Sequence, residues 1–466
     1  MKGWPQHLAT SLQNMLEMRT ALIAALALRL IVMIAAFTLT GTSVMTQGDT
    51  ASYLNPGRSL ILHGTFSSAG LPEIDRTPGY PLFAELTGML WDNALLTVSA
   101  QILISLASLL LVCRIANGIF PNPNAGVVAA WLYAVEPLSI VYAMRLMPET
   151  LFVFLLLLTI DRILSFQNNS KLAELVFAGF SLAAATYVRP VSYYLAVALA
   201  LGIAYTAPKQ RGLWWKAPAV LLAVVIPAIA AWQIRNAVES DYSGFSSIVE
   251  KNLYFFQSAE VTAETQHISL EAEQQQLGYP EDKHYAAAHP EQSGWTQAQR
   301  LRFMRNQSIQ ILEAHPFLYL RTHFAGVALV AFTPCATELL QLLGSYPADG
   351  VMPHRILNEG VVASAKRVIL AHPTVAAVMT MLEAFLLLLY AFAIRGYLSA
   401  GINRPAMRAL IGIAVYFLLI SGGAQAVGRY RLPVMPELCI LAAGGLTPSR
   451  KEKLRSHDSS AADVAN

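Results

Sequence analysis

Asp49 follows the first long apolar stretch of the chain and begins a polar loop that runs to about residue 76. The loop closes with a basic Pro/Gly turn, RTPGYP, at residues 76–81. A carboxylate this close to hydrocarbon is costly unless it is solvated, paired or used in chemistry. An acid and a basic turn at one membrane face indicate a reaction site. The alternative for Asp49 alone is a solvated loop acid, and the positions of the other charges favour the reaction site.

Several arginines fall at or near the same ends of the predicted helices as Asp49. The guanidinium group binds phosphate oxygens bidentately and stays charged at a lipid interface. Snorkelling toward lipid headgroups is the alternative for any one of these arginines. We predict a site for a lipid phosphate that is formed by Arg76, Arg189, Arg235, Arg429 and Arg431.

Glu149 is the second candidate acid, because it begins a predicted helix at the same depth as the arginines. The alternative is an acid that only stabilises a helix N-terminus through the macrodipole. The histidines and cysteines show no metal-ligand spacing, so the sequence predicts no metal site and identifies no cofactor. A divalent metal is possible but has no support in the sequence. The cysteines Cys113, Cys335 and Cys439 are scattered, and two of them lie in apolar runs, which argues against a disulfide framework.

The elements that position these residues are membrane helices. The chain has 466 residues, of which 55% are hydrophobic and 13% charged, and its mean hydropathy is +0.46. A soluble domain carries roughly 25% charged residues. The sequence therefore predicts an all-α polytopic membrane protein, a helical bundle with interfacial helices and outer loops. The net charge of +3 does not indicate a nucleic-acid partner.

The apolar runs predict membrane-spanning helices near residues 21–42, 94–114, 124–143, 149–166, 172–188, 190–207, 217–235, 374–394, 408–422 and 431–447. Residues 78–91 are too few for a crossing. A crossing at 317–343 would place the basic C-terminal tail outside. We interpret both stretches as re-entrant or interfacial helices, which are tolerated at membrane depth where protein or a water-filled cavity covers them.

Basic residues gather in one set of loops, so the positive-inside rule predicts cytoplasmic termini. Four regions are predicted. Residues 1–235 form an N-terminal transmembrane module that contains a first catalytic outer loop at 41–78, and residues 236–316 form a long outer loop. Residues 317–447 form a C-terminal transmembrane module, and residues 448–466 form a disordered cytoplasmic tail.

Seven stretches in order resemble the GT-C superfamily of membrane glycosyltransferases, and most closely its family-39-like group of protein mannosyltransferases and lipid A aminoarabinose transferases. They are GDTASYLNPGRSLILHG at 48–64, RTPGYPLFAEL at 76–86, MRLMPETLFVFLL at 144–156, YVRP at 187–190, WQIRN at 232–236, HPFLYL at 315–320 and RYRLPVMPEL at 429–438. The resemblance implies an outer-face active site in which Asp49 matches the catalytic acid. Many members carry two acids at this loop position, whereas GDT at 48–50 offers one. Whether Glu149 completes the site stays open.

The resemblance predicts transfer of a sugar from a polyprenyl-phosphate donor to an acceptor hydroxyl, with inversion. The acceptor would be a glycan, a lipid or a protein, and we place Tyr53, Tyr80 and Asn236 in the substrate cavity. The expected location is the bacterial inner (plasma) membrane, with the active site on the periplasmic or extracellular side. The alternative is a secondary transporter or flippase of a lipid-linked or anionic substrate, although no internal repeat is detected.

Overall fold

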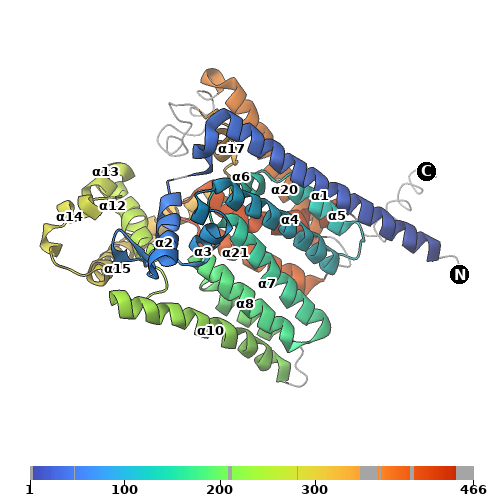
Figure 1. Cartoon of the computed structure of the whole chain (residues 1–466), viewed down its shortest axis with the longest axis horizontal. Coiled ribbons are helices and arrows are strands. Elements are labelled where there is room, and N and C mark those ends of the chain that lie inside the picture. The colour runs from blue at the N-terminus through green and yellow to red at the C-terminus, as the bar shows by residue number, and fades with distance from the viewer. Residues whose placement is uncertain are drawn as a thin grey trace.

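The computed structural model describes residues 4–46, 48–207, 212–280, 282–346, 366, 369–398 and 403–447. This part of the chain is almost entirely helical (Figure 1). Its strands, β1 (Ser67–Ser68) and β2 (Leu71–Pro72), form a small antiparallel hairpin that pairs Ser67 with Pro72. The prediction of an all-α membrane protein is confirmed.

The helical bundle packs around one extended apolar core. Its helices are α1 (Trp4–Thr40), α4 (Ala94–Ile119), α5 (Ala125–Ala134), α6 (Pro137–Ala143), α7 (Glu149–Asn169), α8 (Leu172–Val188), α9 (Leu195–Thr206), α10 (Leu213–Ser240), α16 (Pro316–Phe332), α17 (Ala336–Leu342), α20 (Pro373–Leu398), α21 (Arg404–Ile420) and α22 (Met435–Leu446). Within the described residues, 4 helices are long and apolar enough to cross a membrane, namely α1, α4, α10 and α20. The number rises to 6 if the bent pairs α5–α6 and α16–α17 each count as one span.

The predicted span at 124–143 is not one straight helix, because the chain bends by 56° between α5 and α6. Pro137 begins the second helix, and a proline cannot continue the hydrogen-bond ladder of the first. The Glu136 carboxylate then accepts hydrogen bonds from the amides of Leu138 (2.9 Å) and Ser139 (2.6 Å). This N-cap satisfies backbone donors that the break leaves free.

Two other predicted spans begin with a 3₁₀ turn instead of an α-helix. Residues 190–207 divide into η3 (Pro190–Ser192) and α9, and residues 431–447 belong to η7 (Gly428–Val434) and α22. The stretch predicted as re-entrant at 317–343 is the α16–α17 pair, which bends by 57°. Irregular backbone at membrane depth occurs where it lines a cavity. Arg189 lies at the start of η3, and Arg429 lies within η7.

Glycines allow two of the closest helix approaches. A Cβ on Gly396 of α20 would lie 1.9 Å from the carbonyl oxygen of Leu441 in α22, so only a glycine fits there. A Cβ on Gly79 would lie 2.6 Å from the carbonyl oxygen of Tyr187 at the end of α8. This second contact fixes the turn that follows Arg76 against the bundle.

The first outer loop folds into short helices around the hairpin. They are η1 (Gly41–Met45), α2 (Thr50–His63), α3 (Gly79–Thr87) and η2 (Met89–Trp91). The α3 helix has 9 residues, which agrees with the prediction that residues 78–91 do not cross the membrane.

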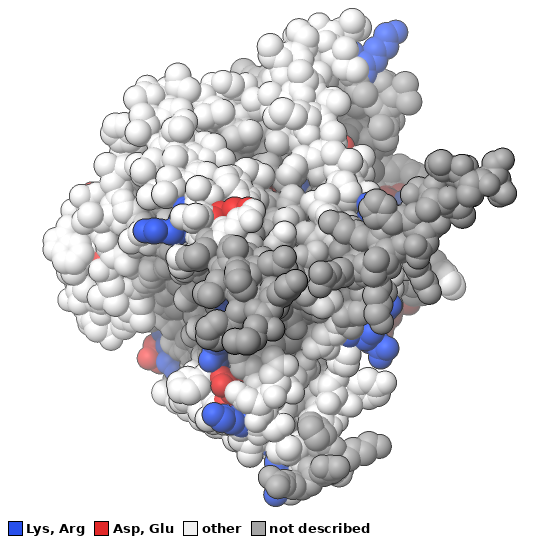
Figure 2. All heavy atoms as spheres, turned by 90° about the vertical axis from the view of Figure 1, so that its right-hand side faces the viewer, with Lys and Arg blue, Asp and Glu red and all other residues white. Residues whose placement is uncertain are grey.

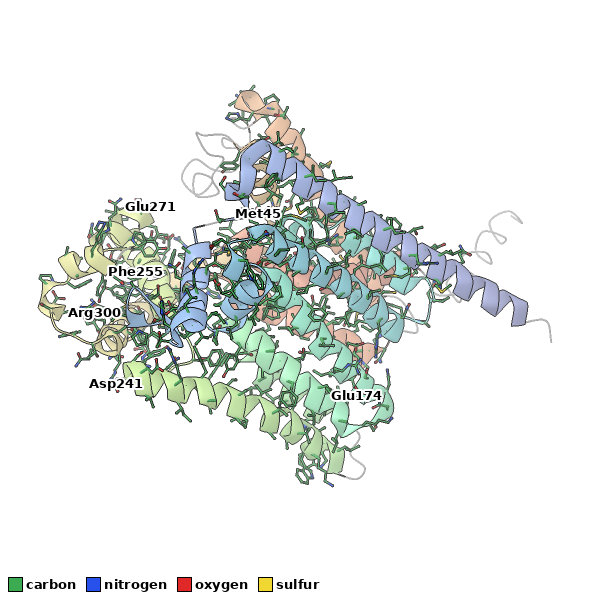
Figure 3. All side chains as sticks on the ribbon, viewed as in Figure 1. Met45, Glu174, Asp241, Phe255, Glu271 and Arg300 are labelled. Carbon is green, nitrogen blue, oxygen red and sulfur yellow. The ribbon has the colours of Figure 1, made fainter. Side chains whose placement is uncertain are left out.

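The long outer loop forms a helical group of its own at the left of Figure 1. It consists of α11 (Ile248–Asn252), the π-helix η5 (Leu253–Ser258), α12 (Ala259–Gln266), α13 (Leu270–Gln276), α14 (Asp282–Ala288), η6 (Pro290–Gln292) and α15 (Gln297–Ala314). A second small core holds it together, and Ile74 of the first loop is buried in that core beside Phe255 and Leu301. Figure 3 places Phe255, Glu271 and Arg300 in this group and Glu174 toward the opposite end of the bundle. The predicted tail at 448–466 lies outside the described residues, and the other domain boundaries stay predictions.

The end of the molecule opposite the outer-loop helices carries basic patches. In Figure 2, the described Lys and Arg side chains on this face form several patches with smaller acidic ones beside them. This distribution is the one that the positive-inside rule associates with a cytoplasmic face.

We expect a cysteine at Ser293, which is exposed in the outer-loop group, to react with an impermeant thiol reagent that is added to intact cells. A cysteine at Asn168, exposed at the far end of α7, should react only after permeabilisation. The reverse pattern would contradict the predicted orientation.

Candidate active site

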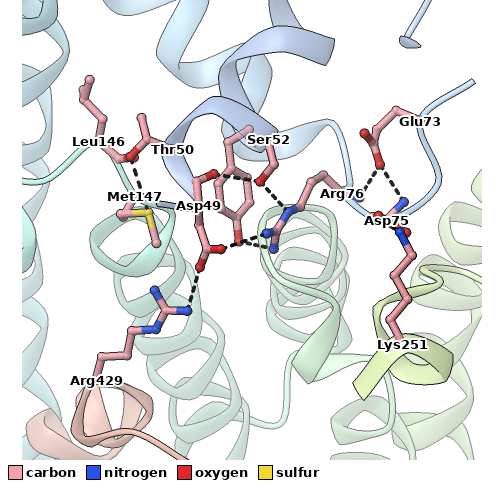
Figure 4. Close-up of polar contacts among 11 residues, drawn as sticks. Asp49, Thr50, Ser52, Glu73, Asp75, Arg76, Leu146, Met147, Lys251 and Arg429 are labelled. Carbon is pink, nitrogen blue, oxygen red and sulfur yellow. Dashed lines mark hydrogen bonds and ion pairs between the residues drawn. The ribbon is translucent and has the colours of Figure 1, made fainter. Parts of the chain in front are cut away.

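Asp49 lies between two arginines at the start of α2 (Figure 4). Its Oδ2 atom accepts a hydrogen bond from Nη2 of Arg429 at 2.7 Å, and its Oδ1 atom lies 3.4 Å from Nη2 of Arg76. The two arginines are 353 positions apart in the sequence (429 − 76), so only the folded chain brings them to one carboxylate. The Asp49 side chain remains 37% exposed. It is therefore paired and still accessible to a substrate.

The charge state of Asp49 follows from this pairing. Burial disfavours the carboxylate, but the charge and hydrogen bond of Arg429, with Arg76 and Arg189 nearby, outweigh burial and hold the pKa of Asp49 below its ordinary value of 3.8. Asp49 is consequently an anion at neutral pH, which is the form that a general base requires.

Arg76 is held on three sides by the first loop. Its Nε donates to Oγ of Ser52 (2.9 Å), its Nη1 donates to the hydroxyl of Tyr53 (3.0 Å), and its guanidinium carbon lies 4.3 Å from the Tyr53 ring centroid. The Glu73 carboxylate accepts hydrogen bonds from the amides of Asp75 and Arg76 and so fixes the turn between them. Arg76 is thus oriented before any substrate binds.

Glu149 and Arg189 form a second acid–arginine pair. Nη1 of Arg189 donates to Oε1 of Glu149 at 3.1 Å, and the Glu149 side chain is only 1% exposed. Its other oxygen, Oε2, is buried and has no hydrogen-bond partner among the described residues. Among the described residues, this bond to Glu149 is the only hydrogen bond of the Arg189 guanidinium group. The remaining guanidinium N–H groups can therefore bind a ligand.

A cavity of about 1160 Å³ joins both pairs to the outer-loop helices. Its lining includes Asp49, Arg76, Glu149, Arg189 and Arg429, with Tyr53. Aromatic side chains of the outer-loop helices and of α16 also line it, among them Phe255, Phe256, Tyr279, Trp295 and Tyr319. The cavity thus offers both charged groups and aromatic surface, as expected for an amphipathic substrate.

The first loop is attached to the long outer loop by a partly buried ion pair. The Asp75 carboxylate contacts Nζ of Lys251 and accepts a hydrogen bond from Oγ of Ser247. Burial opposes its ionisation, but Lys251 and Ser247 hold the pKa of Asp75 below its ordinary value. The amide of Ser247 also donates to the carbonyl of Ile74 at 2.9 Å. Arg76 is therefore positioned by both outer loops at once.

One family model matches part of the chain. Residues 75–233 match the family model described as dolichyl-phosphate-mannose-protein mannosyltransferase. The matched segment contains Arg76, Glu149 and Arg189, whereas Asp49 and Arg429 lie outside it. No curated protein sequence matches the chain.

The match covers 159 of the 466 residues (75–233) and supports the predicted resemblance to membrane glycosyltransferases of the GT-C superfamily.

Among solved structures, the chain is similar to the oligosaccharyltransferase AglB of Archaeoglobus fulgidus in complex with an inhibitory peptide and a dolichol-phosphate, at 13% identity and a TM-score of 0.47. That alignment covers 91% of this chain and 50% of the other. The oligosaccharyltransferase of the same organism with a tethered acceptor peptide gives 13% identity, 91% and 49% coverage and a TM-score of 0.45. The apo form of that enzyme is 14% identical with a TM-score of 0.43, and the alignment covers 90% of this chain and 50% of the other. The chain spans about half the length of these structures.

Four residues that we predicted for the site do not line the large cavity. Arg235 donates to the carbonyls of Glu73 (2.7 Å) and Phe66 (2.6 Å) in the first loop. Its neighbour Asn236 is fully buried and donates to the carbonyl of Gly244 at 2.9 Å. Both side chains hold loop backbone in place. The geometry therefore favours a structural role for each of them over contact with the substrate.

The other two residues, Arg431 and Tyr80, are buried in the bundle. Nη1 of Arg431 donates to the carbonyls of Val330 (2.7 Å), Ala331 (3.0 Å) and Thr333 (2.9 Å), so it caps the last turn of α16. The Tyr80 hydroxyl donates to Oε1 of Gln101 at 2.9 Å. Neither Arg431 nor Tyr80 lines the large cavity.

This difference between Arg429 and Arg431 gives a test. Arg431→Gln is expected to lower the free energy of unfolding by ~1.5–3 kcal/mol, because hydrogen bonds from a buried charged group to helix carbonyls are lost. The measurement is thermal unfolding in detergent. Arg429→Gln should instead lower activity with a smaller change in Tm. If the Arg431→Gln protein is stable but inactive, Arg431 contacts the substrate after all.

The structure also places at this cavity residues that the sequence analysis did not single out. Lys251, Tyr142 and Glu338 line the large cavity, and Asp75 supports it through Lys251. The position of Asp75 directly before Arg76 was the only sequence pattern that could have indicated its role. Its partner, Lys251, is 176 positions away in the sequence. Within the described ranges, no group of three or more His, Cys, Asp or Glu side chains could hold a metal. The absence of a metal site remains a prediction.

Proposed function

We propose that this enzyme transfers a sugar from a polyprenyl-phosphate donor to an acceptor hydroxyl at the outer face of a bacterial inner membrane, with inversion at the anomeric carbon. The observation that carries the proposal is the Asp49 carboxylate, which is accessible and held between two arginines at the head of a cavity of about 1160 Å³. A base, phosphate-binding cations and room for an amphipathic donor are the groups that this reaction needs.

The donor phosphate would bind at Arg189 and Arg76. Arg189 lines the cavity, and most of its guanidinium N–H groups make no hydrogen bond to the described residues. Arg76 is oriented by Ser52 and Tyr53. The leaving phosphate gains negative charge in the transition state, and preorganised cations at that position lower the barrier. The polyprenyl chain would leave the cavity toward the bilayer.

Asp49 would accept the proton from the attacking hydroxyl. The acceptor oxygen forms a bond to the anomeric carbon, the bond from that carbon to the phosphate oxygen breaks, and polyprenyl phosphate leaves with the electron pair. Direct displacement inverts the configuration. Holding both reactants in one site contributes to the rate as well.

A transporter or flippase is the second candidate. Transporters place their polar sites near the midplane between repeats. Here the acid–arginine pairs lie beside the outer loops instead, and Asp49, Arg76 and Lys251 all belong to loops or their short helices. This placement favours chemistry at a membrane face.

Proteoliposomes that contain purified protein, a polyprenyl-phosphate sugar and bacterial membrane glycolipids as acceptors separate the two functions. The enzyme is expected to release polyprenyl phosphate on the side where its outer loops are exposed, without moving intact donor between leaflets. Movement of intact donor with no release of sugar would favour the flippase.

A further inference from the structure

A second cavity, of about 550 Å³, adjoins the large one at Asp49 and Arg429. Gln341 of α17 is also common to both linings. The other walls of this smaller cavity come from the end of α1, from η1 and from the loop before α7. Asp49 therefore lines both cavities and lies where they meet.

The smaller cavity is lined by oxygen atoms and two arginines. Thr40, Ser43 and Thr46 each donate their hydroxyl hydrogen to a backbone carbonyl, at 2.6, 2.9 and 2.8 Å. Their oxygen lone pairs remain available to accept hydrogen bonds from the hydroxyl groups of a ligand. The lining thus suits a molecule with many hydroxyls.

Arg145 gives this cavity a positive charge with an unused donor. It is 3% exposed, and its Nη2 donates to the carbonyl of Glu338 at 3.0 Å. Its Nε is buried and has no hydrogen-bond partner among the described residues, and the same is true of Nε of Arg429. Arg145 and Arg429 both line this cavity, and two guanidinium groups on one wall suit an oxyanion as ligand.

We propose that the smaller cavity binds the acceptor, and that this acceptor is a sugar or glycolipid headgroup that carries an oxyanion near its reacting hydroxyl. The inference rests on the proposed function, because it assigns the second substrate of the same reaction. An inverting displacement needs the attacking hydroxyl and the leaving phosphate on different sides of the anomeric carbon. Two compartments that meet at the base provide this arrangement, with donor phosphate at Arg189 and acceptor anion at Arg145.

Cysteine protection tests the site without requiring turnover. Ser43→Cys places a thiol on the cavity wall, and Thr42→Cys places one on the same 3₁₀ turn outside the lining. We expect glucose 6-phosphate to slow alkylation of Ser43→Cys at least fivefold and to leave Thr42→Cys unchanged. Glucose should protect weakly, and glucuronate shows whether a carboxylate replaces the phosphate. Adding Arg145→Gln should abolish the protection by the charged sugars. Equal protection by glucose and glucose 6-phosphate, or none by any of the three, would overturn the proposal.

A blocking substitution tests the same site in the reaction. Ser43→Trp should reduce transfer from a polyprenyl-phosphate sugar to the glycolipids of bacterial membrane vesicles at least tenfold, while the Kd for the donor stays within twofold. Thr42→Trp is the matched control and should keep the wild-type rate. Unchanged transfer by Ser43→Trp, or loss of donor binding, would contradict an acceptor site. A wild-type protein that never releases polyprenyl phosphate would instead reject the proposed function.

Discussion

Asp49→Asn is expected to lower sugar transfer by about 10²–10⁴-fold, which is the usual contribution of a positioned general base. The substitution is nearly isosteric, and the amide oxygen can still accept the hydrogen bond from Arg429 that spans 2.7 Å in the wild type. It removes only the negative charge and the basicity. Donor binding should therefore persist, and the measurement is initial rate with purified protein beside the Kd for the donor.

Asp92→Asn is the matched control for this substitution. Asp92 also pairs with an arginine, Arg58, but its side chain is 73% exposed and lies outside both cavities. The Asp92→Asn substitution should leave the transfer rate unchanged, because exposed ion pairs contribute little to stability. A similar loss in both variants would show that Asp49 acts only through general stability.

The pH dependence of the wild type provides a check on the same residue. Because the arginines hold the pKa of Asp49 below 3.8, the base stays ionised as the pH falls toward that value. The ion pairs with Arg76 and Arg429 are likewise present above the ordinary pKa and are lost only as the pH falls through the lower, folded-state value. The acidic limb of kcat/KM that belongs to Asp49 should therefore lie below pH 3.8.

Arg189→Lys is expected to lower the transfer rate by about 10²–10³-fold, the usual effect of removing one donor to a developing anion. Lysine keeps the charge that pairs with buried Glu149 but loses the planar fork that binds phosphate oxygens. Retaining the charge avoids leaving Glu149 unpaired, so the fold should be preserved. The measurement is kcat with saturating donor, together with Tm in detergent.

Arg58→Lys is the matched control, since Arg58 is exposed and pairs with Asp92 outside the cavities. Its activity should equal that of the wild type. If Arg189→Lys is fully active, the leaving phosphate is held elsewhere, and Arg76 becomes the main candidate.

The sequence was informative about the charged residues because charge near hydrocarbon has few explanations. Asp49, Arg76, Glu149, Arg189 and Arg429 were selected on that ground, and the structure brings all five to one cavity. Their catalytic roles stay predictions. The helical class was equally accessible, because long apolar runs have few alternatives to membrane helices.

The fate of each arginine could not be predicted from depth alone. Arg429 and Arg431 are two residues apart, and in a 3₁₀ turn with three residues per turn such side chains point to different sides. One therefore reaches Asp49 and the other caps α16. Asp75 was missed for a related reason, because a pairing with Lys251 across 176 positions leaves no local pattern.

Sugar transfer by direct displacement at Asp49 is most directly tested by following a polyprenyl-phosphate sugar that is labelled in both the sugar and the lipid. Purified protein and bacterial membrane glycolipids would be incubated with this donor, and the products identified by mass spectrometry and NMR. We predict equal molar amounts of free polyprenyl phosphate and glycosylated acceptor, with inverted anomeric configuration in the product. Recovery of intact donor, or a product with retained configuration, would contradict direct displacement at Asp49.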